Sequence, residues 1–481
     1  MLETYNLKIG NHDSAATGGA TFEDLSPVTG ESMATIAAAS PADGVKAVAA
    51  ASEAQRGWAQ FPIHKRRAIL LRAADILDQE REKLREVFAL ETGATFAWAD
   101  MNVTEAATTL REAAALVTTS YGTLLPSHDP STVNLSERTP AGVVLAIVPW
   151  NAPLILAARS IAIALAVGNA VVIRPSELAP ITGGYLIANV LHRAGMPDGV
   201  VNVVSSAPGG GRALIETIIA EQAVRRVVFI GSTPVGRSIA SFAAKHLTPS
   251  VMELGGKNAT IVLDDADIDS LATTLAFASF ANSGQVCMCS DRILVYRSRA
   301  EELAELVAAA AQEMTVGDPR DSAVALGPLI NAAGAENFSS LVTDAVDRGA
   351  KILSGKATTD GLYAKPTVLT DVPQLAALNT HESFSPLVAI HAIDSDDEAI
   401  ALANDTEYGL IGSVLSPNRY RAESIARQLK VGAVHVNGPS VGDEPHVPFG
   451  GLGASGFGRL GGLESVHTFT EQRTYYLHGW R

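Results

Sequence analysis

The chain of 481 residues is poor in cysteine, in basic clusters and in histidine groupings. Its two cysteines, Cys287 and Cys289, lie two positions apart and cannot form a disulfide framework, so we expect a reducing, cytoplasmic compartment. Its 36 basic and 51 acidic side chains give a net charge of −15, and the absence of a Lys/Arg run argues against nucleic-acid binding. The 11 histidines are scattered, so no metal site is expected.

The sequence also lacks an uninterrupted apolar run. The most apolar stretch, residues 141–158, has prolines and an asparagine in its middle, which favours a buried strand, turn and helix over a membrane helix. Residues 1–14 mix charged and polar side chains, unlike a signal peptide. With 47% hydrophobic and 18% charged residues, a large core is expected and global disorder is not.

Local patterns predict an α/β fold. Within residues 41–121, Ser40-Pro41 and Pro62 mark the starts of two helices. From residue 141, short runs rich in Val and Ile alternate with helical stretches, which is typical of a doubly wound parallel sheet that binds a nucleotide. The predicted strands of this sheet are Val143–Val148, Ala170–Ile173, Val200–Val204, Arg226–Ile230 and Val251–Leu254.

A second alternation follows from about residue 253. Its predicted elements are the strands Thr260–Leu263, Ile293–Tyr296, Leu387–Ile390 and Ala433–Val436, a helix ending at Phe280, and a helix over Ala300–Met314. The segments Thr132–Glu137 and Glu471–Leu477 alternate like exposed edge strands, which we expect to pair with each other or across subunits. We assign residues 1–121 and 141–252 to the nucleotide-binding domain, 253–453 to a second, catalytic α/β domain, and 122–140 and 466–481 to a small β element for oligomerisation.

Two motifs indicate chemistry. The segment Phe280–Cys287 reads Phe-Ala-Asn-Ser-Gly-Gln-Val-Cys, and Glu253–Lys257 reads Glu-Leu-Gly-Gly-Lys. A thiol in a Gly/Asn/Gln-rich loop, together with a carboxylate beside glycines, indicates an activated nucleophile and its base. A buried cysteine near a turn is the plainer alternative, and the flanking residues disfavour it.

Both motifs resemble the aldehyde dehydrogenase superfamily. The segments Pro149–Pro153 and Asn437–Pro439, and Asp443-Glu444 before Pro448, are similar to its vanillin, benzaldehyde and salicylaldehyde dehydrogenase branch. The resemblance implies an NAD-binding first domain and a homodimer or dimer of dimers.

The resemblance also implies catalytic roles for three residues. Cys287 attacks an aldehyde and Asn151 stabilises the oxyanion that forms. After hydride loss leaves a thioester, Glu253 activates water to release the acid. Leu460 stands where many family members carry a proton-relaying Glu, which leaves more of the base work to Glu253 or to water alone.

NAD is the expected cofactor, bound around three segments. The strand, glycine turn and helix start at Phe229–Gly236 suit a pyrophosphate, and Glu177 offers a carboxylate to ribose hydroxyls. Glu382-Ser383-Phe384 resembles the family's nicotinamide-positioning pair, whereas Arg174 replaces its usual Lys. The expected cofactor-binding residues are Ile147, Trp150, Arg174, Ser176, Glu177, Gly209, Gly231, Ser232, Val235, Leu254, Glu382 and Phe384.

The expected substrate is an aromatic aldehyde with a hydroxylated ring, because Ala152 stands where several family members carry a larger Phe. Arg159 keeps an alternative open, since it could bind the carboxylate of a semialdehyde such as succinate semialdehyde; otherwise it would be a surface charge on its helix. The expected substrate-binding residues are Trp98, Met101, Asn102, Ala152, Arg159, Val286 and Phe449.

Other classes of function fit the sequence less well. A cysteine hydrolase needs a histidine partner for Cys287, and the nearest downstream, His381, lies in no motif. Retention of all three catalytic residues disfavours an inactive binding protein. The glycines of Pro208–Arg212 lack the Lys-Ser/Thr that a phosphate-binding loop requires.

Overall fold

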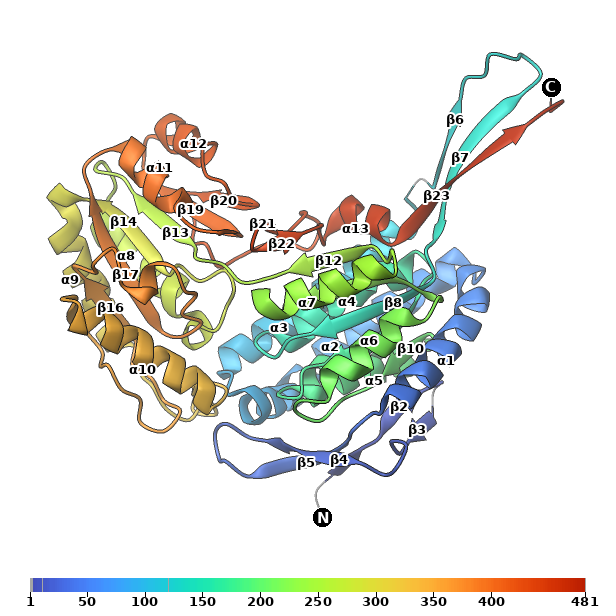
Figure 1. The fold of residues 1–481 in the computed structure, drawn as a ribbon, viewed down its shortest axis with the longest axis horizontal. Helices are drawn as coiled ribbons and strands as arrows, with labels where there is room; N and C mark the ends of the chain where they lie inside the picture. Colours follow the sequence, from blue (N-terminus) through green and yellow to red (C-terminus); the bar gives the residue numbers. More distant parts are fainter. Residues whose placement is uncertain (1–2, 11, 120, 481) are drawn as a thin grey trace.

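The computed structural model describes residues 3–10, 12–119 and 121–480. Two large sheets form two lobes, and a thin three-stranded arm projects away from one of them with the C-terminal strand at its edge (Figure 1). The outer ends of the assigned ranges, residues 1–2 and 481, lie outside the described residues.

The first sheet has eight strands and carries the predicted doubly wound pattern. In order across the sheet they are β22 (Gly456–Phe457), β12 (Ser250–Glu253), β11 (Val224–Ile230), β8 (Val143–Val148), β9 (Ala170–Pro175), β10 (Val201–Val203), β2 (Leu7–Ile9) and β3 (His12–Ser14). The strands from β12 to β10 are parallel. The chain passes from β8 to β9 on one side and later places β11 on the other, so the strand order reverses at β8, where α/β sheets bind ligands.

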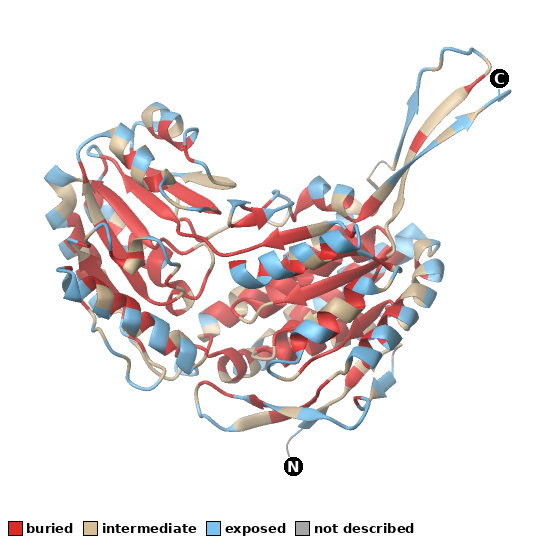
Figure 2. Ribbon diagram, in the orientation of Figure 1, coloured by how far each residue is buried: buried red, intermediate tan, exposed pale blue. Residues whose placement is uncertain are grey.

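Strand β8 is buried on both faces, as a strand in a covered parallel sheet must be. Its alternate side chains enter two cores: Val144, Ala146 and Val148 in one, and Val143, Leu145 and Ile147 in the other. Helix α4 (Pro153–Ala166), buried along its whole length, packs on the first face and is covered in turn by α2 (Ile63–Thr92) and α3 (Phe96–Leu116). Figure 2 shows this interior as continuous buried ribbon.

The helices on the opposite face are α1 (Pro41–Ala59), α6 (Gly211–Ala220) and α7 (Thr233–Lys245). Helix α1 begins as predicted, since the Ser40 hydroxyl and the Asp43 carboxylate cap each other's backbone N–H groups and Pro41 occupies the first turn. Helix α2 begins directly after Pro62, also as predicted.

The second sheet has seven strands, in the order β15 (Lys351–Ser354), β16 (Thr367–Thr370), β17 (Leu387–Ile393), β14 (Arg292–Tyr296), β13 (Ala259–Val262), β19 (Ile411–Leu415) and β20 (Ala433–Val436). Its covering helices are α8 (Ile268–Phe280), α9 (Arg297–Glu313), α10 (Ala332–Asp347), α11 (Asp396–Asn404) and α12 (Arg419–Ala426). All four strands predicted in this half of the chain are present, within a few residues of their predicted ends.

The two edge-type segments pair with each other within the chain, as one of the two expectations had it. Strand β23 (Thr470–Leu477) runs antiparallel to β7 (Val133–Pro140) along its full length, and β6 (Gly122–Leu125) pairs on the other side. The range 466–481 given to this element is too wide, because residues 466–468 end helix α13 (Gly462–Thr468).

Strands in residues 3–37 were not predicted. They are β1 (Glu3–Tyr5), β2, β3, β4 (Thr21–Leu25) and β5 (Ser32–Ala37). Several have only three residues, and most of their side chains are exposed or half-buried, so they lack the apolar alternation that marks a strand. A further pair of short strands, β18 (Tyr408–Gly409) and β21 (Leu452–Gly453), links the second lobe to the C-terminal loops.

Within the described part of the chain, no helix combines the length and hydropathy that a bilayer crossing requires. Its His, Cys, Asp and Glu side chains form no group of three that could hold a metal ion.

Two buried carboxyl groups lie near each other where the N-terminal strands meet the first lobe. Glu91, at the end of α2, accepts hydrogen bonds from the N–H groups of Ile181 (2.6 Å) and Thr182 (2.9 Å), whereas the Asp24 carboxyl of β4 has no hydrogen-bond partner among the described residues. Two buried carboxylates repel each other, so this arrangement favours the protonated forms. Burial raises the pKa of Asp24 to about 7 and that of Glu91 well above its usual value.

These raised pKa values predict a stability that falls with rising pH. The unfolded chain releases the protons near pH 4 while the folded chain keeps them, so the contribution is complete below about pH 4 and is lost through pH 7. Asp24→Asn is neutral at every pH and should remove much of the loss, on the order of 1–3 kcal/mol at pH 8. Unfolding midpoints at pH 5.5 and 8 measure it, with Glu23→Gln on the same strand as control; an unchanged pH response in Asp24→Asn would contradict the protonation of Asp24 in the folded chain.

Candidate active site

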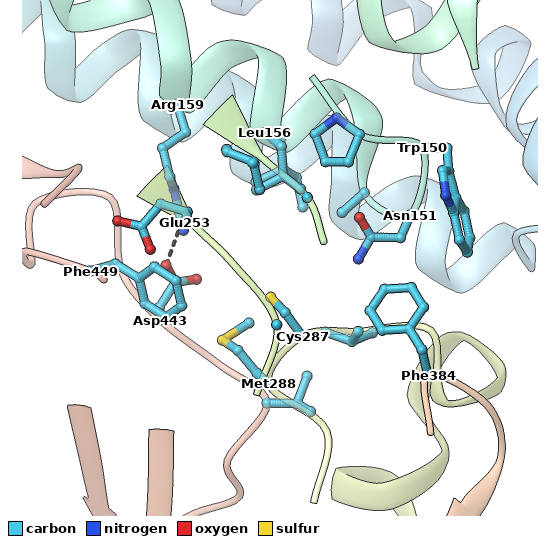
Figure 3. A pocket seen from close by; sticks show the side chains of 18 of the residues that line it. Trp150, Asn151, Leu156, Arg159, Glu253, Cys287, Met288, Phe384, Asp443 and Phe449 are labelled. Carbon is cyan, nitrogen blue, oxygen red and sulfur yellow. Dashed lines mark ion pairs between the residues drawn. The ribbon is translucent and has the colours of Figure 1, made fainter. Parts of the chain in front are cut away.

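A cavity of about 490 Å³ lies where the carboxyl ends of β8, β11 and β12 face the loop that leads into β14 (Figure 3). Its walls are mainly apolar, with a few polar groups among them. Fifteen of the predicted site residues line it: Trp98, Met101, Trp150, Asn151, Ala152, Arg159, Gly231, Ser232, Glu253, Leu254, Val286, Cys287, Glu382, Phe384 and Phe449.

Cys287 follows a loop whose backbone is left-handed at three consecutive residues. Asn282, Ser283 and Gly284 have φ angles of 51°, 58° and 72°. For residues other than glycine this conformation costs on the order of 1–2 kcal/mol each. Gly284 is required for a second reason, because a Cβ there would overlap the Ser385 carbonyl oxygen.

Hydrogen bonds hold this strained loop in place. Ser283 Oγ donates to the Gly327 carbonyl at 2.8 Å, and Gln285 Oε1 accepts from the N–H of Ile330 at 2.9 Å. The polar residues of the motif therefore support the backbone that presents Cys287.

The structure separates the two cysteines. The Cys287 sulfur points into the cavity (Figure 3). Burial, followed by the nearby Glu382 and Glu253 carboxylates, raises the pKa of this thiol to about 12, so the resting group is a neutral thiol. Cys289 packs in the core, with Sγ 3.8 Å from the Ala281 carbonyl oxygen, and does not line the cavity.

Asn151 is fixed at the turn between β8 and α4. Its carbonyl oxygen accepts hydrogen bonds from Trp98 Nε1 at 3.0 Å and from Asn282 Nδ2 at 3.1 Å. Its own Nδ2 donates to the Gln285 carbonyl at 3.0 Å. The amide is thus held against the nucleophile loop, on the same side of the cavity as the Cys287 sulfur (Figure 3).

Glu253 ends β12 and is 4% exposed. Among the described residues, neither of its carboxyl oxygens has a hydrogen-bond partner. Burial raises its pKa well above the usual value, while Arg459 and Arg159 oppose this shift. Gly450 makes room for the carboxyl group, since a Cβ there would lie 2.5 Å from Glu253 Oε1. A buried, unpaired carboxyl with a raised pKa is suited to exchange protons.

The predicted nicotinamide pair also reaches the cavity. Glu382 accepts a hydrogen bond from the Gly256 N–H at 3.0 Å, and burial raises its pKa to about 8. The Phe384 ring meets Trp150 edge to face, with centroids 5.6 Å apart. Phe384 itself has φ of 46°, a strained conformation of the kind that clusters at functional sites.

The remaining predicted cofactor residues lie outside the cavity. Arg174, Ser176 and Glu177 are at or just after the end of β9, Gly209 precedes α6, and Val235 is half exposed on α7. Glu177 is paired with Arg174 at 2.9 Å. The side chain of Ile147 is 3% exposed and packs in the core, so only its backbone is available to a ligand at this edge of the sheet.

The carboxyl edge of the first sheet fits a dinucleotide. Ser232 is the N-cap of α7, and its side chain makes no capping hydrogen bond. The first N–H groups of a helix have no intrahelical partner, so this helix start can receive a phosphate. Ser232 and Gly231 would hold the pyrophosphate, and the Glu382 and Phe384 loop would hold the nicotinamide end.

The structure changes two expectations about the predicted substrate-binding residues. Arg159 is not a surface charge: it is 8% exposed, pairs with Asp443 at 2.5 Å, and lies over the Phe449 ring at 5.4 Å. Asn102 is fully buried, donates to the Trp98 carbonyl at 3.0 Å and does not line the cavity, so it supports α3 instead of contacting a substrate.

Sequence reasoning missed two polar residues of the site. Glu105 lines the cavity, and its position four residues after Met101 on α3 was a signal that the helix face continued. Asn258 donates from Nδ2 to the carbonyl oxygens of Cys287 (2.7 Å) and Cys289 (2.8 Å). The only sequence signal for this supporting role is that Asn258 directly follows Lys257, the last residue of the Glu253 motif.

This constellation and fold have known counterparts, which confirm the resemblance in the sequence. The chain belongs to the aldehyde dehydrogenase family, whose model matches residues 14–475. The protein is an enzyme, an aldehyde dehydrogenase dependent on a nicotinamide dinucleotide.

Similar proteins match along almost the whole chain. A vanillin dehydrogenase of Pseudomonas sp. (strain HR199 / DSM 7063) is 44% identical over 97% of this chain and 96% of its own length. A benzaldehyde dehydrogenase [NAD(+)] of Pseudomonas putida is 40% identical over 95% and 93%. The crystal structure of a salicylaldehyde dehydrogenase from Pseudomonas putida G7, complexed with salicylaldehyde, superposes with a TM-score of 0.96 at 36% identity, covering 99% of this chain and 98% of that one.

The position of the two thiols yields a prediction. Cys287→Ala should abolish aldehyde oxidation but keep dinucleotide binding, because it removes the thiol that the sequence predicts to be the nucleophile and leaves the first sheet untouched. Cys289→Ala should stay active, since that sulfur packs in the core. Absorbance of reduced cofactor and calorimetric titration of the dinucleotide measure the two properties. Activity in Cys287→Ala with loss in Cys289→Ala would reverse the assignment.

Proposed function

We propose that the enzyme oxidises an aromatic aldehyde, of the hydroxylated benzaldehyde type, to the carboxylic acid through a thiohemiacetal and a thioester on Cys287. The observation that carries this proposal is the apolar cavity in which Cys287, Asn151 and Glu253 meet beside aromatic side chains. The relatives named for vanillin, benzaldehyde and salicylaldehyde support the same substrate class.

In this proposal each of the three polar residues has one role. The Cys287 sulfur bonds to the aldehyde carbon, and the Asn151 amide stabilises the oxyanion, an effect worth about 10²- to 10³-fold in kcat for one donor. A dinucleotide held by Ser232, Glu382 and Phe384 would supply the hydride acceptor. Glu253 then takes a proton from water, whose oxygen attacks the thioester carbon, and the C–S bond breaks to free Cys287 and the acid.

The polar end of the cavity favours an uncharged substrate over a semialdehyde. Arg159 is already paired with Asp443, and Glu105 adds a second carboxyl group on the same wall. A substrate carboxylate would have to displace Asp443 from Arg159 and would face Glu105, which is unfavourable in a partly buried site. An aromatic ring needs only apolar contact, and Trp98 and Phe449 offer it.

A cysteine hydrolase fits the site poorly. No histidine is among the described residues that line the cavity, so Cys287 has no imidazole base there. We place the enzyme in the cytoplasm, where a free thiol nucleophile stays reduced.

We also propose that NAD is preferred to NADP. A 2′-phosphate near the adenine ribose would approach Glu177, and like charges at about 4 Å repel by roughly 4 kcal/mol at an effective dielectric near 20. Arg174 offsets part of this repulsion, but its Nη2 is already bonded to Glu177.

A panel of aldehydes with either cofactor tests both proposals. Benzaldehyde and hydroxybenzaldehydes should exceed acetaldehyde and succinate semialdehyde by about tenfold or more in kcat/KM, since 1.4 kcal/mol is a factor of ten, and NAD should exceed NADP. Ala152→Phe should reduce the aromatic rate more than the acetaldehyde rate, because it fills the wall beside Asn151. A preference for succinate semialdehyde that Arg159→Ala selectively removes would refute the aromatic assignment.

We further propose a homodimer or a dimer of dimers. The arm carries exposed apolar side chains: Leu124 (71%), Leu125 (47%) and Tyr476 (66%) on β6 and β23, the two edge strands of its sheet, and Trp480 (70%) beyond the end of β23. Such edges are normally covered. Light scattering at micromolar concentration should give a mass of at least two chains, which charged substitutions at Leu124 and Tyr476 should reduce. A monomeric mass for the unmodified protein would exclude the proposal.

A further inference from the structure

The proposed reaction releases protons inside a buried site. Oxidation of an aldehyde by a nicotinamide dinucleotide and water yields the carboxylate, the reduced cofactor and two protons. One is lost as the Cys287 thiol adds and hydride leaves, and the other comes from the attacking water. Glu253 is the base, and at 4% exposure it must pass protons onward before the next turnover.

The residues packed around Glu253 restrict where those protons go. Leu460 occupies the position of the family's relay Glu, is fully buried, and is tied through backbone hydrogen bonds to Phe449. The Arg459 guanidinium donates to the carbonyl oxygens of Gly451 and Gly458, and a cation of this kind cannot accept a proton.

The other charged groups near Glu253 lie on the cavity wall. Asp443 interacts electrostatically with Glu253 and with Glu105, and its side chain is 20% exposed. Burial and then Asp443 raise the pKa of the Glu105 carboxyl, so this group also holds protons readily. Arg159 fixes Asp443 at 2.5 Å, and Figure 3 shows their ion pair beside Glu253. All three carboxyl groups line the cavity; Glu253 is buried, and Asp443 and Glu105 are partly exposed.

Both Glu253 oxygens are buried and have no hydrogen-bond partner in the described part of the chain, whereas buried carboxyl oxygens normally bind protein donors or water. We propose that Asp443, held by Arg159, is the positioning residue through which Glu253 returns its protons to solvent, by way of a bridging water, with Glu105 next along the path. In each transfer the proton leaves Glu253 for water, the water gives a proton to Asp443, and Asp443 releases it outward, so no other reactant is needed. The inference rests on the proposed function.

The test is a kinetic comparison with benzaldehyde and NAD, since benzaldehyde has no ring hydroxyl that Asp443 could bind. Asp443→Asn keeps the size of the side chain but cannot carry a proton. It should retain the first-turnover burst of NADH and lower steady-state turnover by about tenfold or more. Glu253→Gln should lower steady-state turnover further. The acyl adduct on Cys287 should accumulate and be visible by intact mass. Glu444→Gln, the adjacent exposed carboxyl, is the matched control and should behave as wild type.

Two further readouts separate proton transfer from structural support. Imidazole, a small proton carrier, should raise the turnover of Asp443→Asn with increasing concentration but leave wild type and Glu444→Gln unchanged. Asp443→Glu should recover part of the lost rate and a pH profile close to that of wild type. If Asp443→Asn is unstable because Arg159 loses its counter-charge, the double variant Arg159→Gln/Asp443→Asn removes both charges. This double variant is then measured in the same assay.

The outcomes distinguish this inference from the proposed function. A lost burst, a rise in KM with unchanged kcat, or a slow turnover that ignores imidazole would overturn the role of Asp443. Wild-type turnover in Asp443→Asn would also overturn the role of Asp443, but it would leave the proposed oxidation of aldehydes unaffected. If wild-type enzyme forms no NADH with any aromatic aldehyde, the proposed function itself fails.

Discussion

The close approach of Gly284 to the Ser385 carbonyl is the contact on which the site depends. It lets the left-handed residues before Cys287 pack against the loop that carries Glu382 and Phe384, with no side chain between them. Because the loop before Cys287 also bonds to Asn151 through Asn282 and Gln285, this strained backbone segment sets the positions of the thiol, the Asn151 amide and the loop of Glu382 and Phe384 together.

Burial of ionisable groups dominates the electrostatics of the cavity. The pKa values of Cys287, Glu253 and Glu382 all rise, and desolvation is the first cause in each. The resting site therefore holds its protons, and one fixed ion pair, Arg159 with Asp443, supplies charge at its polar end. Burial in such a cavity disfavours charged groups on a substrate. The transfer of protons between its carboxyl groups therefore matters more to the reaction than the attraction of charged ligands.

The sequence alone determined the class of fold and the family of enzyme. The Val- and Ile-rich runs predicted the central strands of both sheets because those strands are buried on both faces. The motifs at Glu253 and Cys287 indicated the family, since glycine, asparagine and glutamine at fixed spacing are required by the backbone that carries the thiol. Ser40 and Pro41 predicted the start of α1 because the capping hydrogen bond and the first-turn proline involve only neighbouring residues.

Tertiary structure decided what local pattern does not encode. The short N-terminal strands exist because neighbouring segments offer them edges, and their exposed side chains carry no periodic signal. Arg159 was open to assignment as a surface charge until the fold placed it beside Asp443, 284 residues further along the chain (443 − 159). The burial of Asp24 near Glu91, and the hydrogen bond from Asn258 to the Cys287 carbonyl, likewise bring distant segments together. Side-chain type and spacing specify which local structure forms, whereas the burial and charge partners of a group are set only when the sheets and loops pack.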